Sequence, residues 1–290
     1  MHDAIIIGRG PAGMSAALYT VRANLKTLVV GRRDSALSRA GKIDNYFGFA
    51  ETVSGSYLLD EGERQISRLG AELVEDEVIS VEKGDFFNVK TTSGEYTSKT
   101  LLFATGQPQK KVPVENLDEF EGKGVSYCTT CDGFFYNNLK VGVLGFRDFA
   151  IHEAVELLTF TKNITIYTNG KELELSEESK QIADSFKVNT RPVQKLDGSE
   201  FLQRIHFKDG TSEEIDGIFV AYGSASSADF ARKLGVIVDG SSIVVDRKQQ
   251  TNIDGAFAAG DCTGVFKQVS IAVGQGALAG RSMIEYARSL

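Results

Sequence analysis

The sequence predicts an α/β protein of two Rossmann-like nucleotide-binding domains, with the second domain inserted into the first. A short apolar run, a glycine-rich turn and a helix-forming stretch open the chain, and the same order returns near residue 140. Two further segments, 101–106 and 218–223, match each other as apolar runs that end in glycine. The 290 residues are also long for a single core. We therefore expect two related halves.

The first half opens with an apolar strand at residues 4–7 and the turn Gly8-Arg9-Gly10-Pro11-Ala12-Gly13, and a helix is expected over 14–22. This is the Gly-x-Gly-x-x-Gly fingerprint in the strand–turn–helix setting of dinucleotide-binding folds. Gly8 permits the tight turn, Gly10 lets the backbone approach a pyrophosphate, and Gly13 lets the helix pack on the strand. The phosphates would lie at the positive end of the helix. The alternative is a glycine-rich turn that binds nothing.

The next strand, at 27–30, ends in Gly31-Arg32-Arg33 rather than in the acidic residue that usually binds a ribose. Two arginines there would by themselves suggest the 2′-phosphate of NADP. The alternatives are that the arginines contact the phosphates of a different cofactor or that they are solvated. The half continues with a loop at 42–48, a helix at 56–69, alternating strands over 77–99 and a strand that ends in Gly106.

The second half follows a linker that contains Lys110-Lys111. A strand is expected at 140–144, a turn at Gly145 and a helix at 148–161. The chain then returns to the first half, through 255–261 and a final helix at 268–288. We therefore predict a discontinuous nucleotide-binding domain at 1–112 and 246–290, and an inserted domain at 113–245.

Two of the three cysteines lie in the segment Cys128-Thr129-Thr130-Cys131. Thiols at this spacing can close a small disulfide, and a cysteine near a helix N-terminus is more acidic than a free one. A zinc site needs four ligands, whereas the other candidates are scattered without ligand spacing (Cys262, His2, His152 and His206). We interpret the pair as redox-active, with a metal site or inert thiols as the alternatives.

The overall composition excludes several classes of protein. The net charge of −7 is spread without long blocks of like charge, so nucleic acid is not an expected partner. No apolar run approaches membrane-spanning length, so no membrane association is expected. Few cysteines and no export signal predict a cytoplasmic protein, in which a vicinal cysteine pair is more often catalytic than structural.

These features resemble the low-molecular-weight thioredoxin reductase family over nearly the whole chain. The motifs that carry the resemblance are 8–13, Ala104-Thr105-Gly106, the segment 124–136 around the cysteines, and 255–261. The resemblance implies a homodimeric FAD enzyme that reduces a disulfide on thioredoxin. It also implies that Cys131 faces the flavin, that Cys128 attacks the substrate disulfide and that Asp132 moves a proton.

The resemblance further implies a set of flavin contacts. Asp261 should bind the ribityl chain, Gln268 with Val269 should meet the ring, and Asn45 matches an asparagine of the flavin loop. The Gly-Gly-Gln that precedes this loop in the family is replaced by Ser35-Ala36-Leu37. The expected cofactor-binding residues are Gly8, Gly10, Pro11, Ala12, Gly13, Arg32, Lys42, Asn45, Gly106, Gly260, Asp261, Gln268 and Val269, with no metal ligands.

The second half departs from family members that use NADPH. Its turn reads Gly145-Phe146-Arg147-Asp148, and we expect Phe146 to stand where backbone must approach a pyrophosphate. The Asp148 carboxylate can cap the helix and repel phosphate. The strand at 164–167 opens into Thr168-Asn169, without an arginine for a 2′-phosphate or an acid for NAD. Together these changes predict a lost nicotinamide site. The alternative is an unconventional site built on Arg147 and Lys171.

This departure is similar to that of the ferredoxin-dependent flavin thioredoxin reductases, a branch that lacks the same motifs. We therefore expect reduced ferredoxin to be the electron donor. Ferredoxins are generally acidic, so docking would need a local basic face on this acidic chain. The candidates for that face, which are otherwise ordinary solvated charges, are Arg32, Arg33, Arg39, Lys42, Lys110 and Lys111.

Three other interpretations stay open on the sequence. The first is an NADPH-dependent thioredoxin reductase with an unconventional nucleotide site. The second is a diflavin disulfide oxidoreductase, with another flavin in the degenerate half. The third is a flavin-binding sensor without turnover, against which the intact set of Cys128, Cys131 and Asp132 argues.

Overall fold

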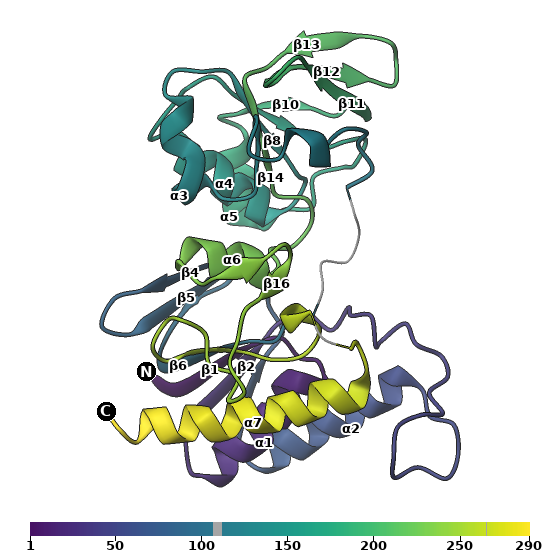
Figure 1. The fold of residues 1–290 in the computed structure, drawn as a ribbon, viewed down its shortest axis with the longest axis vertical. Coiled ribbons are helices and arrows are strands. Elements are labelled where there is room, and N and C mark those ends of the chain that lie inside the picture. The colour runs from purple at the N-terminus through teal and green to yellow at the C-terminus, as the bar shows by residue number, and fades with distance from the viewer. Residues whose placement is uncertain (107–111, 265) are drawn as a thin grey trace. The chain divides into compact units, whose positions relative to one another are not determined.

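The computed structural model describes residues 1–106, 112–264 and 266–290, and the chain divides into two compact units (Figure 1). One unit comprises Met1–Gln109 with Ser226–Leu290, and the other comprises Lys110–Ala225. The predicted insertion of one Rossmann-like half into the other is therefore present. The chain returns to the first unit at Ser226 and not at residue 246 as expected.

The earlier return has a local cause. Helix α6 (Ser227–Lys233) begins at Ser227, whose backbone N–H and hydroxyl lie 2.9 and 2.7 Å from the Thr105 hydroxyl. The same helix packs against β4 (Val78–Lys83). These contacts join the segment after Ser226 to the end of the central strand of the first unit.

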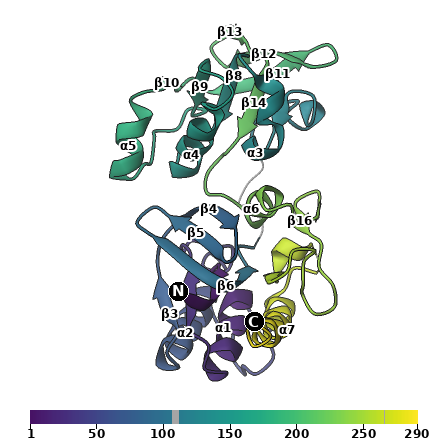
Figure 2. The same ribbon diagram turned by 90° about the vertical axis from the view of Figure 1, so that its left-hand side faces the viewer.

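The first unit is built on a seven-stranded sheet in the order β3-β2-β1-β6-β5-β4, with β17 also paired to β6. Strand β6 (Glu95–Phe103) is shared between two parts of this sheet. Its beginning pairs antiparallel with β5, and its last three residues pair parallel with β17. Figure 2 shows β4 and β5 beside it. The other strands are β1 (His2–Ile7), β2 (Thr27–Val30), β3 (Glu72–Val74), β5 (Phe87–Thr91) and β17 (Ala256–Ala258).

Three helices of the first unit lie side by side in Figure 1, and α1 (Pro11–Arg22) packs against both α2 (Gly55–Arg68) and α7 (Val269–Ala287). The contact between α1 and α7 brings two backbones together. A Cβ atom on Gly276 would overlap the carbonyl oxygen of Ala12, and one on Gly280 would press on that of Ala16. Glycine on α7 therefore permits a packing that no larger residue allows.

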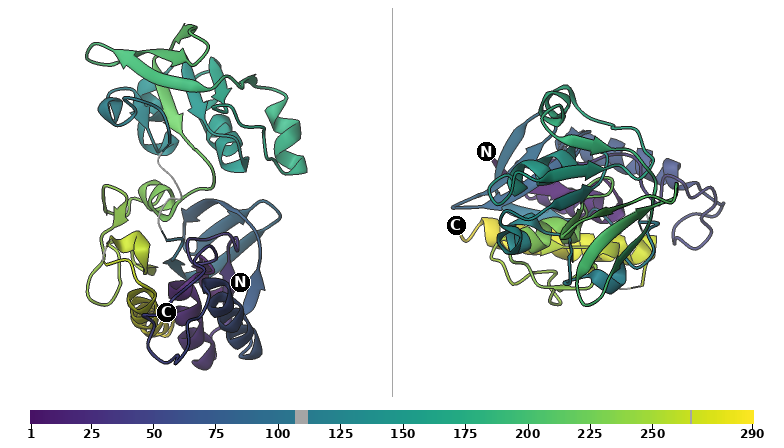
Figure 3. Two further views of the ribbon diagram at one scale, coloured as in Figure 1. Left: turned by 90° about the vertical axis from the view of Figure 1, so that its right-hand side faces the viewer. Right: turned by 90° about the horizontal axis from the view of Figure 1, so that it is seen from above.

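The second unit repeats the arrangement with a five-stranded parallel sheet in the order β10-β9-β8-β14-β7. A three-stranded antiparallel sheet, green in Figure 3, accompanies it. The parallel strands are β7 (Val125–Ser126), β8 (Val141–Leu144), β9 (Ile164–Tyr167), β10 (Lys187–Asn189) and β14 (Gly217–Val220). The antiparallel strands are β11 (Val193–Gly198), β12 (Leu202–Phe207) and β13 (Ser212–Glu214), and the helices are α3 (Thr129–Asp132), α4 (Asp148–Leu157) and α5 (Glu177–Ala183).

The same kind of tight contact occurs separately within each half. A Cβ atom on Gly8 would overlap the carbonyl oxygen of Ala104, and a Cβ atom on Gly145 would overlap that of Ala221. In each half the first strand therefore turns into its helix against the end of a neighbouring strand. The remaining short elements are β15 (Val238–Asp239), β16 (Ser242–Ile243), η1 (Asp118–Phe120), η2 (Gly133–Tyr136) and η3 (Asp261–Thr263). Within the described residues, no helix is both long enough and apolar enough to cross a membrane.

Replacing Gly276 with alanine should destabilise the first unit by about 1–3 kcal/mol, because the added methyl group would push α7 away from α1. Denaturant unfolding followed by circular dichroism measures the change. Gly274→Ala on the same helix is the matched control, since a Cβ atom there meets no atom within 4 Å. The control should be neutral or stabilising, because alanine is favoured over glycine in a helix by about 1 kcal/mol. Equal unfolding midpoints for the two variants would contradict this packing.

Candidate redox and flavin sites

Cys128 and Cys131 form a disulfide in the second unit, with their Cα atoms 5.3 Å apart. Cys128 is the residue before α3, and its Sγ accepts the backbone N–H of Cys131 at 3.1 Å. Cys128 is only 2% exposed, whereas Cys131 is exposed. A hydrogen bond to the charged form of an acid favours that form. The N–H of Cys131 is therefore placed to stabilise a Cys128 thiolate after reduction.

Asp132 is tied to the cysteine pair through Ser126. The Ser126 hydroxyl donates to Asp132 Oδ2 at 2.7 Å and accepts the backbone N–H of Cys128 at 3.1 Å. Burial raises the pKa of the nearby Tyr136 phenol, and the negative charge of Asp132 raises it further. One serine therefore connects the Asp132 carboxylate to the backbone of Cys128, on the short segment that holds all three predicted catalytic residues.

Two exposed aromatic residues follow this segment. Phe134 and Phe135 are 70% and 72% exposed, and their rings meet edge to face with centroids 6.1 Å apart. They belong to η2, which packs on α3. Large apolar side chains at this exposure beside a redox disulfide form a candidate contact surface for a protein substrate.

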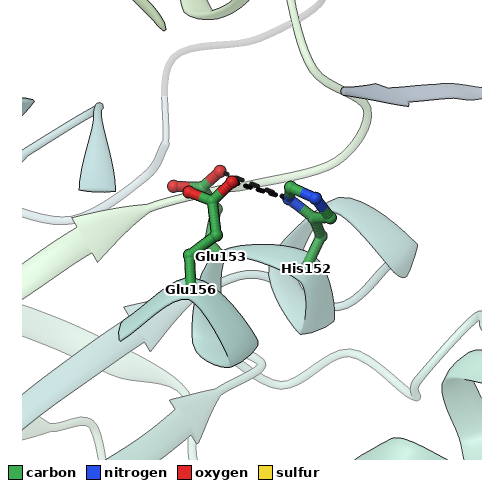
Figure 4. A group of neighbouring side chains, drawn as sticks. All are labelled: His152, Glu153 and Glu156. Carbon is green, nitrogen blue, oxygen red and sulfur yellow. Dashed lines mark ion pairs between the residues drawn. The ribbon is translucent and has the colours of Figure 1, made fainter. Parts of the chain in front are cut away.

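Glu153 on α4 was not among the residues predicted to belong to the site. Its side chain is 2% exposed, and its Oε2 accepts the hydroxyl and the backbone N–H of Thr129 at 2.6 and 3.3 Å. Figure 4 shows Glu153 with its neighbours His152 and Glu156. Each of the three side chains has one nitrogen or oxygen atom that could bind a metal, and these three atoms lie within 4.8 Å of one another. Two acids and a histidine on a helix are typical of a solvated face. Only the fold shows that one of them is turned inward toward the cysteine segment.

The turn before α1 in the first unit is open for a phosphate. Gly10 is the N-cap of α1, no side chain caps the helix, and no acidic residue lies in its first turn. A Cβ atom on Gly10 would meet no atom within 4 Å, whereas one on Gly13 would overlap the carbonyl oxygen of Gly8. The free N–H groups and bare backbone suit a pyrophosphate. Pro11 and Ala12, also predicted to bind the cofactor, form the first residues of the helix.

The remaining predicted flavin residues of the first unit lie at turns and helix starts. The Asn45 amide donates to Oε1 of Gln268 at 2.9 Å, and Val269 is the first residue of α7. Asp261 opens η3 directly after Gly260, which has a φ of 84°. Burial raises the pKa of the Asp261 carboxyl, an effect that the charge of Lys267 partly offsets. Gly106, with a φ of 73°, has open space around it.

The basic residues of the first unit are largely paired with acids. Arg32 lies 2.9 Å from Glu77, Arg33 is paired with Asp60, and Arg39 with Asp34. Lys42 is exposed. The expected basic face is therefore largely neutralised among its described members, and Lys110 and Lys111 lie outside the described residues.

Arg9 lies inside the Gly-x-Gly-x-x-Gly fingerprint but is not one of the predicted cofactor-binding residues. It is buried, it forms ion pairs with Glu63 at 2.7 Å and Glu75 at 3.2 Å, and it lies 3.4 Å from the carbonyl oxygen of Gly31. A guanidinium group therefore links the phosphate turn to the end of β2, where a ribose-binding acid was expected and is missing.

The corresponding turn of the second unit is built differently. Arg147 is the N-cap of α4 and takes the place that Gly10 has before α1, so the residue where backbone would approach a pyrophosphate is Arg147 and not Phe146 as expected. Phe146 is instead buried against Tyr222, with ring centroids 5.1 Å apart. The Arg147 guanidinium binds the carboxylate of Glu174 at 2.6 Å. The backbone N–H of Glu174 also donates to the Phe146 carbonyl at 2.9 Å, so the segment after β9 is fastened to the turn.

Asp148 also binds the segment after β9, although it was expected to cap α4. Rather than capping α4, its carboxylate accepts the backbone N–H of Ser176 at 3.1 Å and also the Ser176 hydroxyl. The side chains that follow β9 also form hydrogen bonds within the protein. Thr168 donates to the carbonyl of Lys171 at 2.6 Å, and Asn169 accepts the N–H of Val193 at 2.7 Å.

Residues 2–276 match the pyridine nucleotide-disulphide oxidoreductase family. The chain belongs to this family. Among its relatives is a thioredoxin reductase of Streptomyces coelicolor, 33% identical over 293 residues, which cover 95% of this chain and 91% of the relative. The resemblance to thioredoxin reductases found in the sequence is thus confirmed.

Two solved structures of oxidoreductases are similar over the whole chain. The atypical thioredoxin reductase TRi from Desulfovibrio vulgaris Hildenborough has a TM-score of 0.95 and 43% identity, covering 100% of this chain and 99% of that chain. A ferredoxin-flavin thioredoxin reductase from Clostridium acetobutylicum has a TM-score of 0.72 and 28% identity, with the same coverage. The predicted atypical branch of the family is confirmed by these likenesses.

Membership of this oxidoreductase family confirms the prediction of FAD. The residues of the first unit fit the cofactor, because the N-terminus of α1 is uncapped and Gly10 leaves space beside it. Gly8, Gly10 and Gly13 would hold the pyrophosphate, and Asp261 would accept a hydroxyl of the ribityl chain. Asn45 and Gln268 already bind each other where the ring is expected.

Asp261→Asn should weaken FAD binding without destabilising the apo-protein. A charge-assisted hydrogen bond contributes about 1.5–3 kcal/mol, so Kd should rise roughly 10- to 100-fold in a flavin-fluorescence titration. Because burial raises the pKa of Asp261, its ionised form costs folding free energy at pH 7, and the amide removes that cost. Asp254→Asn, at an exposed acid before β17, should leave both quantities unchanged. Unchanged FAD affinity in Asp261→Asn would contradict the assigned contact.

Proposed function

We propose that this protein is a thioredoxin-disulfide reductase that receives electrons from reduced ferredoxin. The electrons pass through FAD to the Cys128–Cys131 pair and from there to thioredoxin. The observation that carries the proposal is the contrast between its two turns. The N-cap of α1 is a bare glycine and its first turn has no acid, whereas α4 has Arg147, paired with Glu174, as its N-cap and Asp148 in its first turn, in the unit that holds the Cys128–Cys131 disulfide. We further propose the cytoplasmic homodimer that the sequence predicted.

The chemistry of the cysteine pair follows from its contacts. When bound, FAD supplies the two electrons that reduce the disulfide. The Cys128 thiolate, stabilised by the N–H of Cys131 at 3.1 Å, attacks the thioredoxin disulfide and forms a mixed disulfide. Cys131 then attacks Cys128, which restores the internal disulfide and releases reduced thioredoxin. Asp132 exchanges the protons, and Phe134 with Phe135 offers an apolar surface to the substrate.

The residues at the start of α4 argue against both rival uses of the second unit. NADPH and a second FAD each carry a pyrophosphate, which would meet a side chain in place of bare glycine backbone and the acidic Asp148 in the first turn. The loop between β9 and α5 is bound to this region through Arg147 and Asp148. The unconventional site suggested by Arg147 and Lys171 is disfavoured too, because the Arg147 guanidinium is bound to Glu174.

Ferredoxin fits this arrangement because a protein donor needs only a face near the flavin edge and no nucleotide pocket. The similar structure from Clostridium acetobutylicum is a ferredoxin-flavin thioredoxin reductase, and its likeness covers 100% of this chain. The ion pairs of Arg32, Arg33 and Arg39 leave Lys42 as the candidate for direct attraction among the described members of the basic face.

Replacing each of the two cysteines with serine should have a different effect on electron transfer. Cys131→Ser should keep a reducible flavin, lose transfer to the pair, and trap thioredoxin on Cys128. Cys128→Ser should stop thioredoxin turnover without trapping it, because the thiolate with the N–H bond is gone. Non-reducing gels detect the trapped species when a thioredoxin variant that lacks its own second cysteine carries thionitrobenzoate in a mixed disulfide on the remaining one, because the attacking thiol then displaces the thionitrobenzoate. Because Cys131 is the exposed sulfur in the structure, trapping by Cys128→Ser and not by Cys131→Ser would reverse the roles.

Reduced ferredoxin should bleach the flavin band rapidly, whereas NADPH and NADH should do so slowly or not at all. Each lost charge-assisted phosphate contact removes about 1.5–3 kcal/mol, so two or three together weaken nucleotide binding by roughly three powers of ten. Stopped-flow mixing under argon compares the donors. The ferredoxin rate should fall with added salt and in Lys42→Glu, while chemical reduction by dithionite should be unaffected. Rapid bleaching by micromolar NADPH would contradict the proposal that ferredoxin is the electron donor.

A further inference from the structure

Ser126 on β7 is bonded to both Asp132 and Cys128, and it is only 3% exposed. Its hydroxyl donates to Oδ2 of Asp132 at 2.7 Å and accepts the backbone N–H of Cys128 at 3.1 Å. The carbonyl oxygen of Cys128 is a second acceptor for the same hydroxyl, at 3.3 Å. One buried oxygen atom therefore has three polar partners, and all three belong to the segment that carries the redox disulfide.

The backbone of Asp132 is also bound to Cys128. Its N–H donates to the Cys128 carbonyl oxygen at 3.1 Å, which closes the single turn of α3. Its side chain returns through Ser126 to the N–H of the same cysteine. Two separate links therefore fix Asp132 relative to Cys128, and only the link through Ser126 involves a carboxyl oxygen that can carry a proton.

The three partners of Ser126 allow Asp132 to gain and to lose a proton. A hydroxyl group has one hydrogen to donate and two lone pairs that accept. When Asp132 is ionised, the hydroxyl donates to the carboxylate. When Oδ2 carries a proton, it can donate to Ser126 Oγ, and the hydroxyl hydrogen can turn to the Cys128 carbonyl. Each of these groups then keeps a hydrogen-bond partner in both states, as buried polar groups require.

We propose that Ser126 is a positioning residue, which holds the Asp132 carboxyl for proton exchange in both of its protonation states. The inference rests on the proposed role of Asp132 in moving protons. Reduction of one substrate disulfide takes two electrons and two protons from the reduced cysteine pair, closes the Cys128–Cys131 disulfide and releases two thiols. Each thiolate that leaves the substrate gains one of these protons, and a carboxyl group held in place can pass it on.

Other ionisable groups lie on the elements that pack on α3. They are Tyr136 in η2 and Asp148, His152, Glu153 and Glu156 on α4. The variants that test the proposal keep all of these side chains, so the same neighbours surround the cysteine segment in every protein compared.

The test compares two disulfides whose leaving groups differ in their need for a proton. The cysteine pair of the holoenzyme is reduced with dithiothreitol, and the reductant is removed under argon. The protein is then mixed at pH 7 with glutathione disulfide or with the symmetrical disulfide of thionitrobenzoate. Acid quenching, alkylation and mass shift follow the closure of the internal disulfide. Thionitrobenzoate leaves as a stable anion, whereas the more basic glutathione thiolate takes up a proton.

The readout is the rate constant with thionitrobenzoate disulfide divided by that with glutathione disulfide. Asp132→Asn should raise this ratio by about 100-fold or more, because a positioned acid typically contributes about 10²–10⁴-fold. Ser126→Ala keeps the acid but releases it, so the ratio should rise about tenfold. Adding Ser126→Ala to Asp132→Asn should raise the ratio no further, because the group that Ser126 positions is already gone.

Two variants separate positioning from structure. Ser126→Thr keeps the hydroxyl and should keep the wild-type ratio. Thr161→Val removes another buried hydroxyl of the second unit, which donates to the Leu139 carbonyl at 2.7 Å and accepts the N–H of Asn163 at 3.1 Å. It should leave the ratio unchanged, since both of these partners are backbone groups.

An unchanged ratio in Ser126→Ala, a similar rise in Ser126→Thr or Thr161→Val, or a further rise in the double variant would overturn the inference. An unchanged ratio in Asp132→Asn would contradict the proposed role of Asp132 as well. The assay uses neither ferredoxin nor thioredoxin, so its outcome does not depend on the proposed donor or substrate.

Discussion

The residues at the start of a helix decide whether its backbone N–H groups can bind a ligand phosphate, and these residues differ between the two halves of the molecule. Before α1, bare glycine backbone leaves the helix end open. Before α4, Arg147 brings a guanidinium group to the equivalent position, and Glu174 binds it. Only one arrangement suits a pyrophosphate. The number of nucleotides that the chain can hold, and so the kind of donor it needs, depends on this difference.

The fold survives this difference because another constraint is met in both halves. Gly8 and Gly145 each pass against a carbonyl oxygen at the end of a neighbouring strand, where no side chain fits. That close approach builds the strand–turn–helix unit whether or not a ligand follows. A half can therefore lose nucleotide binding and keep its architecture, which makes architecture alone a poor guide to its ligand.

Local patterns in the sequence predicted much of the fold and part of the site. Strands β2 and β9 have the predicted bounds, since each is a short apolar run between clear turn signals. The cysteine pair and the first fingerprint were also identified, because the residues that define each motif lie close together in the sequence. The inward turn of Glu153, the bond from Asp148 to Ser176 and the return of the chain at Ser226 were not identified. Each depends on contacts between segments distant in sequence, which periodicity does not contain.

The interrupted first unit has a consequence for synthesis on the ribosome. Strand β17 pairs with β6, and α7 packs on α1, so the part of the first unit that is made before the inserted unit depends on the part that is made after it. Until α7 has been made, the apolar face of α1 lacks its longest helical neighbour. The inserted unit, Lys110–Ala225, is continuous and has its own buried cluster, so it can fold while the rest is still being made. The segment that carries the cysteines therefore forms before the flavin has a finished place to bind.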